Sequence, residues 1–146
     1  MIRINYPDKK PSIRQEQGKE LVFCIIRRRW VVLSPEEWVR QNFLLYLTEV
    51  LAYPSSLIAV EKQLLLGDVK KRFDIVVFNR QTKPHMLVEC KEMNVQLTES
   101  VVSQVLRYNI PLQAGLLVIT NGSYSAAFER RGAQFEPIAT LPGFSD

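Results

Sequence analysis

The sequence predicts an α/β protein in which helices flank a central β-sheet. Most apolar residues fall in runs of strand length rich in Val, Ile, Leu and Phe, and two other segments carry apolar residues at helical spacing. Gly, Asn and Pro mark turns between many of these segments. With 146 residues, of which 47% are hydrophobic and 23% charged, the chain is large enough to bury a core of its own.

The first part of the chain predicts two different structures. Residues 1–18 are rich in Pro, Lys and Gln and predict an extended N-terminal arm, which leaves residues 19–146 as a single domain. The apolar runs "ELVFCII" and "WVVL" follow, separated by "RRR". This pattern predicts a hairpin or one long bent strand.

Several features bear on the location of the protein. The first twenty residues contain no apolar region of the kind that signal peptides carry. No apolar run approaches the roughly 20 residues that a membrane-spanning helix needs. Both cysteines, Cys24 and Cys90, lie in apolar runs, a pattern that does not indicate a disulfide framework. Together these features predict a reduced, cytoplasmic protein.

The stretch "SPEEWVRQNFLLYLTEVLAYP" predicts a helix from residue 35 to about residue 52. Ser34 is a candidate N-cap, and Pro35 suits the first helical position. Glu37 stands where it would complete a Ser-x-x-Glu capping box. Pro54 limits the far end of the helix.

Residues 57–91 predict an antiparallel meander of three strands. Its segments are "SLIAVEKQLLLG", "KRFDIVVFN" and "HMLVECKE", and Gly67-Asp68 marks the first turn. A second helix is predicted from about residue 98 to about residue 110, with both helices packed on the sheet. The run "GLLVITNG" predicts another buried strand, and short strand-like pieces follow to residue 140.

The last two strands of the meander carry charged residues whose placement suggests a site. Asp74 lies inside one, and Glu89 and Lys91 flank Cys90 at the end of the next. Because side chains alternate along a strand, Glu89 and Lys91 share a face. Asp74 shares a face with Val76 and Phe78, and antiparallel neighbours would let Asp74 meet Glu89 across the ladder.

Such a group of charges suits a divalent metal ion. Two nearby carboxylates repel each other, and Mg²⁺ or Mn²⁺ prefers oxygen ligands, to which the Cys90 carbonyl could add one more. The Cys90 thiol would point to the other face of the sheet. A bound metal lowers the pKa of its water, and Lys91 can then orient that water or help to deprotonate it. An alternative stays open: a partly buried ion pair between Asp74 and Lys91, with Glu89 facing solvent.

The order of these motifs resembles the PD-(D/E)xK nuclease superfamily. Residues 35–121 match its order of a helix, a meander that carries two acids and a lysine, a second helix and a further strand. Phe73 stands where the superfamily's motif name has proline. The chain also resembles the N-terminal nuclease domain of type I restriction enzyme R subunits, over about residues 20–125. The matching stretches are "RRRWVVLSPEEWVRQNFLLYL", "LIAVEKQL", "KRFDIVVFNR", "VECKEMN", "QVLRYN" and "LLVITNG".

This resemblance implies a restriction-endonuclease-like fold with a mixed central sheet, and it implies roles for five residues. Asp74, Glu89 and Lys91 match the catalytic triad of the superfamily. Gln104 and Tyr108 match a Gln-x-x-x-Tyr motif on the second helix, where they would hold the DNA backbone or help to position Lys91. Considered without the resemblance, Gln104 and Tyr108 are a polar pair at the edge of the core.

The first helix of such nucleases often supplies another acid, and Glu36 and Glu37 both compete for that role. The capping box already explains Glu37. Glu36 fits an E-x-x-x-R pattern with Arg40 that resembles the pattern of the family. Glu36 is therefore the preferred ligand, although acids at a helix N-terminus are also favourable without any catalytic role.

Basic residues add a weaker indication of a nucleic-acid partner. The net charge is +4 and the isoelectric point about 9.2. Lys70, Lys71 and Arg72 directly precede Asp74, and we expect them to contact phosphates. Phosphate contacts and a solvated turn explain residues 27–29 equally well.

The sequence thus predicts a metal-dependent DNA endonuclease domain, related to restriction or DNA processing, that hydrolyses phosphodiester bonds with Mg²⁺ or Mn²⁺. Its partner would be DNA. The chain holds no Gly-x-x-x-x-Gly-Lys-Ser/Thr loop, so a separate motor or specificity protein could act with it. The alternatives are a nuclease-fold module that binds nucleic acid or proteins without activity, and an interaction protein whose charges form ion pairs only.

Overall fold

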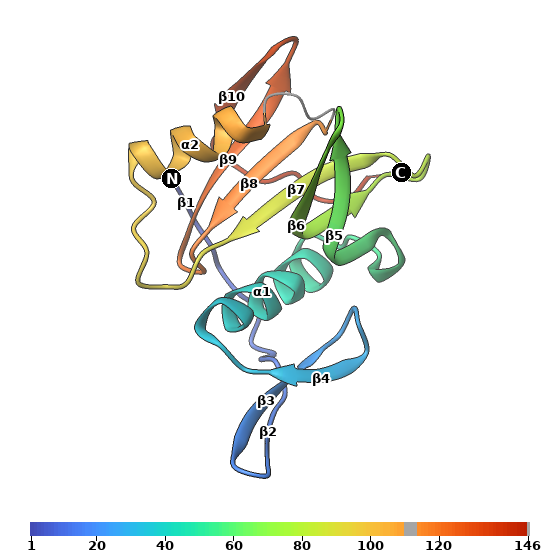
Figure 1. The fold of residues 1–146 in the computed structure, drawn as a ribbon, viewed down its shortest axis with the longest axis vertical. Coiled ribbons are helices and arrows are strands. Elements are labelled where there is room, and N and C mark those ends of the chain that lie inside the picture. The colour runs from blue at the N-terminus through green and yellow to red at the C-terminus, as the bar shows by residue number, and fades with distance from the viewer. Residues whose placement is uncertain (110–113, 146) are drawn as a thin grey trace.

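The computed structural model describes residues 1–109 and 114–145, apart from the side chains of Leu66 and Tyr108. Within these residues, one mixed sheet has the strand order β1-β9-β8-β7-β6-β5, and β10 pairs with β9 (Figure 1). Its strands are β1 (Ile2–Arg3), β5 (Ile58–Leu66), β6 (Val69–Phe78), β7 (Pro84–Cys90), β8 (Leu116–Thr120), β9 (Tyr124–Arg131) and β10 (Gln134–Ile138). The predicted α/β class with a mixed central sheet is confirmed.

The predicted meander forms as expected. Strands β5, β6 and β7 pair antiparallel in chain order. Gly67 takes a φ of +62° in the turn between β5 and β6, a conformation that costs glycine little because it has no Cβ. Strand β7 then pairs parallel with β8. A parallel pair needs a crossover connection, and α2 (Glu99–Asn109) lies in that crossover.

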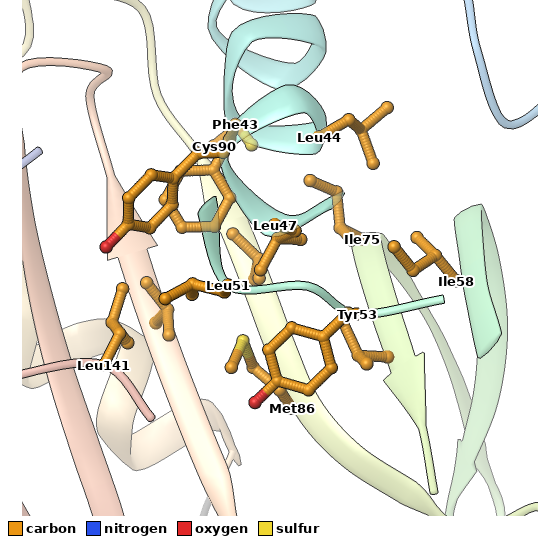
Figure 2. Close-up of a cluster of buried hydrophobic side chains, with 14 of the residues drawn as sticks. Phe43, Leu44, Leu47, Leu51, Tyr53, Ile58, Ile75, Met86, Cys90 and Leu141 are labelled. Atoms are coloured by element: carbon orange, nitrogen blue, oxygen red, sulfur yellow. The ribbon is translucent and has the colours of Figure 1, made fainter. Parts of the chain in front are cut away.

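The two long helices cover opposite faces of the sheet. Helix α1 (Pro35–Leu45) continues as a π-helical turn, Tyr46–Val50, and a short 3₁₀ turn, Ser55–Leu57, precedes β5. Phe43 and Leu47 pack with Ile75 and Met86 in the largest apolar cluster (Figure 2). On the other face, α2 packs on a second cluster, whose buried members are Phe73, Val76, Leu87, Ala114 and Leu117.

A smaller sheet lies on the far side of α1 from the large sheet (Figure 1). It consists of β2 (Ile13–Glu16), β3 (Lys19–Cys24) and β4 (Arg29–Val32), paired antiparallel. The β3–β4 pair confirms the hairpin expected from the two apolar runs. Residues 1–18, expected as an extended arm, supply β1 and β2, and the division of the chain at residue 18 stays a prediction.

The start of α1 differs from a complete capping box. The Ser34 hydroxyl accepts a hydrogen bond from the Glu37 amide at 3.1 Å, so Ser34 is the N-cap as predicted. The Glu37 carboxylate, however, accepts from Arg27, Arg40 and Gln41. This carboxylate is therefore part of a buried network, and the expectation that the capping box explains Glu37 was incomplete.

Within the described residues, no helix is both long enough and apolar enough to cross a membrane.

Candidate active site

The β5–β6 hairpin changes faces at Asp74. In a regular strand Phe73 and Ile75 would share a face, but Phe73 packs in the α2 cluster and Ile75 in the α1 cluster. The ladder from β5 pairs Lys62 with Phe73 and Val60 with Ile75, and it omits the position between them, where Glu61 stands opposite Asp74. The regular alternation of side chains between the two faces of the sheet is therefore interrupted at this point.

This interruption directs Asp74 toward α1. Its Oδ1 atom accepts a hydrogen bond from Arg40 Nη2 on α1 at 3.0 Å, and its Oδ2 atom accepts from the Cys90 backbone amide at 2.7 Å. Val76 and Phe78 pack on the α2 side instead. The expectation that Asp74 shares their face was wrong, because the strand does not alternate regularly through residue 74.

Glu89 lies on the α2 face, at the end of β7. It lines an open cleft of about 400 Å³ together with Lys71, Lys91 and Gln104. Its Oε1 atom is buried and accepts no hydrogen bond from the described residues, and Lys71 Nζ is 3.9 Å away. A buried carboxylate oxygen without a hydrogen-bond donor destabilises the folded state, so binding a cation or a donor at this atom would be favourable.

Most of the predicted site residues are close enough to Glu89 to shift its pKa. Burial raises the pKa of Glu89 to about 7, and the negative charge of Asp74 adds to the shift. Lys71 and Lys91 lower that pKa, and Glu36 raises it slightly. Asp74 and Glu36 are therefore close enough to act on Glu89 through their charge, although their side chains do not line the Glu89 cleft.

Lys91 and Cys90 lie where the chain leaves β7. The Lys91 amide donates to the Thr120 carbonyl at 2.8 Å, which fixes the backbone beside the cleft. Among the described residues, no carboxylate lies within ion-pair distance of Lys91, so the alternative of an ion pair with Asp74 does not form. The Cys90 thiol is buried in the α1 cluster (Figure 2), whereas Glu89 lines the cleft on the α2 side, so the two side chains take opposite faces as predicted. Burial raises the pKa of Cys90 well above the usual range.

Of the predicted pair on the second helix, Gln104 is exposed and lines the Glu89 cleft. The side chain of Tyr108 lies outside the described residues. A third polar residue of α2, Asn109, is buried and accepts a hydrogen bond from Lys71 Nζ at 3.2 Å.

The two acids of α1 have different environments. Glu37 is 8% exposed, and its carboxylate accepts from both Arg27 and Arg40 at about 3 Å. Glu36 is exposed, and partial burial together with the charge of Asp74 raises its pKa. Glu36 thus keeps an accessible carboxylate near Asp74, while the hydrogen bonds of Glu37 are used within the protein.

The basic residues before Asp74 separate into two groups. Lys70 and Arg72 are exposed, whereas Lys71 is half-buried over the Phe73 ring, next to Glu89. Arg27, considered earlier as a phosphate contact or a solvated residue, is neither. It is 16% exposed and pairs with Glu37 and Glu61.

The donor set suits a hard cation such as Mg²⁺. The orphaned Glu89 oxygen, the raised Glu89 pKa and the nearby Asp74 and Glu36 charges all indicate a deficit of positive charge. Among the described residues, no three acidic, His or Cys side chains are arranged to enclose a metal. Mg²⁺ does not require such a cage, because it binds through one or two carboxylates, waters and substrate phosphates.

Two contacts of the site were not predicted from the sequence. Arg40 was noted only as part of a motif, but it holds Asp74 directly. Lys71 was grouped with its neighbours, but it lies beside Glu89. The position of Arg40 three and four residues before the apolar Phe43 and Leu44, on the same helix face, was the available signal that it points inward.

A mixed sheet between two helices, with an acid and a lysine where its meander ends, defines a restriction-endonuclease-like α/β protein. More particularly, the chain belongs to the family described as the N terminus of the type I restriction enzyme R protein, whose sequence model matches residues 35–142. A search among curated proteins gives no match. Family membership supports a restriction-related nuclease function.

Proposed function

We propose that this chain is a metal-dependent DNA endonuclease domain that hydrolyses phosphodiester bonds with Mg²⁺ or Mn²⁺. The observation that carries the proposal is the Glu89 carboxylate, whose buried Oε1 atom accepts no hydrogen bond from the described residues. Its pKa of about 7 means that a bound cation would favour the ionised form near neutral pH. A buried acid with a strongly raised pKa beside an open cleft is the kind of group that functional sites use.

Asp74 is held toward α1 and Glu89 lines the cleft on the α2 side, but Asp74 also contacts the Cys90 amide, and its charge raises the Glu89 pKa. The metal would lie where these two carboxylates approach each other at the end of β7, with the Cys90 carbonyl and Glu36 as further oxygen ligands. When bound, the metal supplies a lowered pKa for the attacking water and positive charge beside the phosphoryl group. Arg40 keeps one Asp74 oxygen fixed, which limits the directions in which that carboxylate can bind.

Lys91 would orient the attacking water and offset negative charge that develops on the phosphoryl oxygens. The absence of an ion pair between Lys91 and the described residues supports this role, because its ammonium group is available to a ligand. Gln104 and Tyr108 would contact the DNA backbone, and Lys70 and Arg72 would bind phosphates farther along.

A second candidate function also has a specific observation in its favour. Arg40 and Lys71 already bring positive charge to Asp74 and Glu89, as they could in a module that binds DNA without cutting it. In either case DNA would be the ligand, and a separate motor or specificity protein could direct the chain to its target.

Incubation with supercoiled plasmid and Mg²⁺ or Mn²⁺ separates the two functions. An endonuclease converts the plasmid to nicked and linear forms, and Glu89→Gln and Lys91→Ala abolish this conversion. Glu136→Gln on β10 is the matched control, because its carboxylate is exposed and distant from the cleft in sequence and strand order. Plasmid that is bound but stays supercoiled with either metal would favour the inactive module.

A further inference from the structure

A second hollow, not used by the proposed chemistry, lies beside the first half of α1. It has a volume of about 430 Å³ and is lined by residues of α1, the N-terminal segment and the turn between β8 and β9. We call it the aromatic hollow, after three aromatic residues in its lining: Tyr6, Trp38 and Tyr124. Its size lies within the range of small-ligand sites.

The charge around the aromatic hollow is entirely positive. Arg3 and Lys10 line it, both are exposed, and no lining residue is acidic. Neither Arg3 nor Lys10 forms an ion pair with a described residue. Cations that are not neutralised by the protein suit an anionic ligand.

The pairing of β1 with β9 places an arginine beside an aromatic ring at the hollow. Arg3 of β1 stands directly opposite Tyr124 of β9, so their side chains leave the same face as close neighbours. Tyr124 is 46% exposed although its ring is apolar. Tyr6 is held by a hydrogen bond from its hydroxyl to the Gly122 carbonyl. The hollow therefore presents aromatic surface and cationic groups in a defined arrangement.

The aromatic hollow adjoins the Glu89 cleft through a third hollow. Val95 lines both the Glu89 cleft and this intermediate hollow. Met93 and Tyr124 line both the intermediate hollow and the aromatic hollow. The segment that follows Lys91 thus supplies lining residues to all three hollows, which places the aromatic hollow on the same side of this segment's course as the proposed catalytic residues' neighbours Val95 and Met93.

We propose that the aromatic hollow binds an unstacked base of single-stranded DNA, with the adjoining phosphates on Arg3 and Lys10. Aromatic side chains with nearby cations are how proteins hold single strands, because every unstacked base offers a face for stacking. A base inside a duplex cannot enter a concave hollow without leaving its stack. The inference rests on the proposed function, and it specifies the substrate class as DNA with a single-stranded segment beside the duplex.

The test compares two labelled DNA ligands that share one duplex. One ligand is blunt, and the other carries a tail of about ten thymidines, a length that spans one single-strand site. Fluorescence anisotropy in EDTA measures binding without cleavage. We expect the tailed ligand to bind about tenfold more tightly to the wild-type chain, the gain typical of one stacked base.

Substitutions then locate the preference. Tyr124→Ala and Arg3→Gln should each remove most of this gain, whereas Tyr124→Phe should keep it because the ring remains. Arg131→Gln is the charge-matched control, since Arg131 is exposed and does not line the hollow. In a Trp30→Phe background, the tailed ligand should also quench the fluorescence of Trp38. Circular dichroism verifies that each variant is folded.

The result for this inference is independent of the result for catalysis. If wild-type protein cuts plasmid but binds tailed and blunt DNA equally, the inference fails and the endonuclease proposal stands. If the wild-type protein does not cut plasmid but prefers the tailed ligand, and Tyr124→Ala removes that preference, the endonuclease proposal fails and the single-strand site stands. If Tyr124→Ala changes the oligomeric state in sedimentation and leaves DNA binding unchanged, the hollow is a contact between copies and the inference is overturned.

Discussion

Arg40 joins Asp74 of the meander to Glu37 of its own helix. Its Nη2 atom donates to Asp74 Oδ1 at 3.0 Å and its Nη1 atom to Glu37 Oε1 at 2.9 Å. Arg40 is 5% exposed, so both contacts form with little access to water. This one side chain therefore fixes the distance between α1 and the strand that carries the first proposed metal ligand.

Arg40→Gln should lower the free energy of unfolding by about 3 kcal/mol, because it leaves the poorly exposed Asp74 carboxylate without its cation and removes one of the two arginines that pair with Glu37. Urea unfolding of both proteins at pH 7 measures the change. Arg131→Gln is the control, since Arg131 forms exposed ion pairs whose loss costs about 0.5 kcal/mol. Equal losses from the two substitutions would show that the Arg40 contacts are not coupled to stability.

Glu89 should make stability depend on pH in a direction unusual for an acid. Because its pKa is raised from 4.5 to about 7, the folded protein binds this proton more tightly than the unfolded chain. The resulting stability is complete below the unfolded pKa and is lost as the pH rises through about 7. Glu89→Gln resembles the protonated form, so above pH 8 it should be more stable than wild type by up to about 3 kcal/mol.

Urea unfolding at pH 4.5 and pH 8.5 measures this difference, which should shrink toward zero at the lower pH. Comparing the two proteins at each pH cancels the titration of other groups. A constant difference between them would mean that Glu89 is solvated and that its pKa is ordinary.

Asp74 and Lys91 should affect metal binding in opposite directions. Asp74→Ala removes an oxygen ligand and should weaken the binding of Mn²⁺ as well as abolish cleavage. Lys91→Ala should also abolish cleavage, but it should leave metal binding intact or tighten it, because a nearby positive charge is lost. Calorimetric titration of the DNA-free proteins provides the affinities. Equal weakening in both variants would contradict the assigned roles.

The exposed cations before Asp74 should govern the salt dependence of DNA binding. Replacing Lys70 and Arg72 together by Gln should reduce the slope of log affinity against log salt by up to about 2, whatever the DNA sequence. The matched control replaces Lys83 and Arg131 by Gln, two exposed cations elsewhere on the chain. If the double variant keeps the wild-type slope and the control does not, the phosphate-binding surface has been assigned wrongly.

Lys71 should behave differently from Lys70 and Arg72 because it lies beside Glu89. Lys71→Gln removes a charge that lowers the Glu89 pKa. The pH at which Glu89 loses its contribution to stability should therefore rise further above 7, as measured by the pH dependence of urea unfolding. Its salt slope should change less than that of the double variant.

Most of the fold could be predicted because its signals are local. Apolar runs of strand length and the Gly67-Asp68 turn located the meander, and Ser34 with Pro35 located the start of α1. The pairing of β1 with β9 could not be predicted, since it joins residues more than a hundred positions apart and β1 is only Ile2–Arg3. Strand β2 was missed because all four of its residues are exposed and it carries no apolar alternation.

The candidate site could be predicted in its residues but not in its geometry. Acids and a lysine inside apolar strands are visible in any reading of the chain. The change of face at Asp74 could not be predicted. Phe73 and Ile75 are both apolar and buried, so the sequence pattern is the same whichever of the two clusters each residue joins. The partner of each charge depends on how α1 packs on the sheet, a tertiary property that residue spacing does not contain.

The omitted ladder position at Glu61 has a consequence for self-association. Strand β5 is the outer strand of the large sheet, and a long regular outer strand is a template for pairing with another molecule. Glu61 interrupts that strand with a φ of +52°, and its carboxylate pairs with Arg27 at 3.4 Å. The residue that completes the ion-pair network thus also protects the edge of the sheet. A change at this position that gave β5 extended backbone throughout would leave the sheet a longer regular edge, on which strands of other molecules could pair.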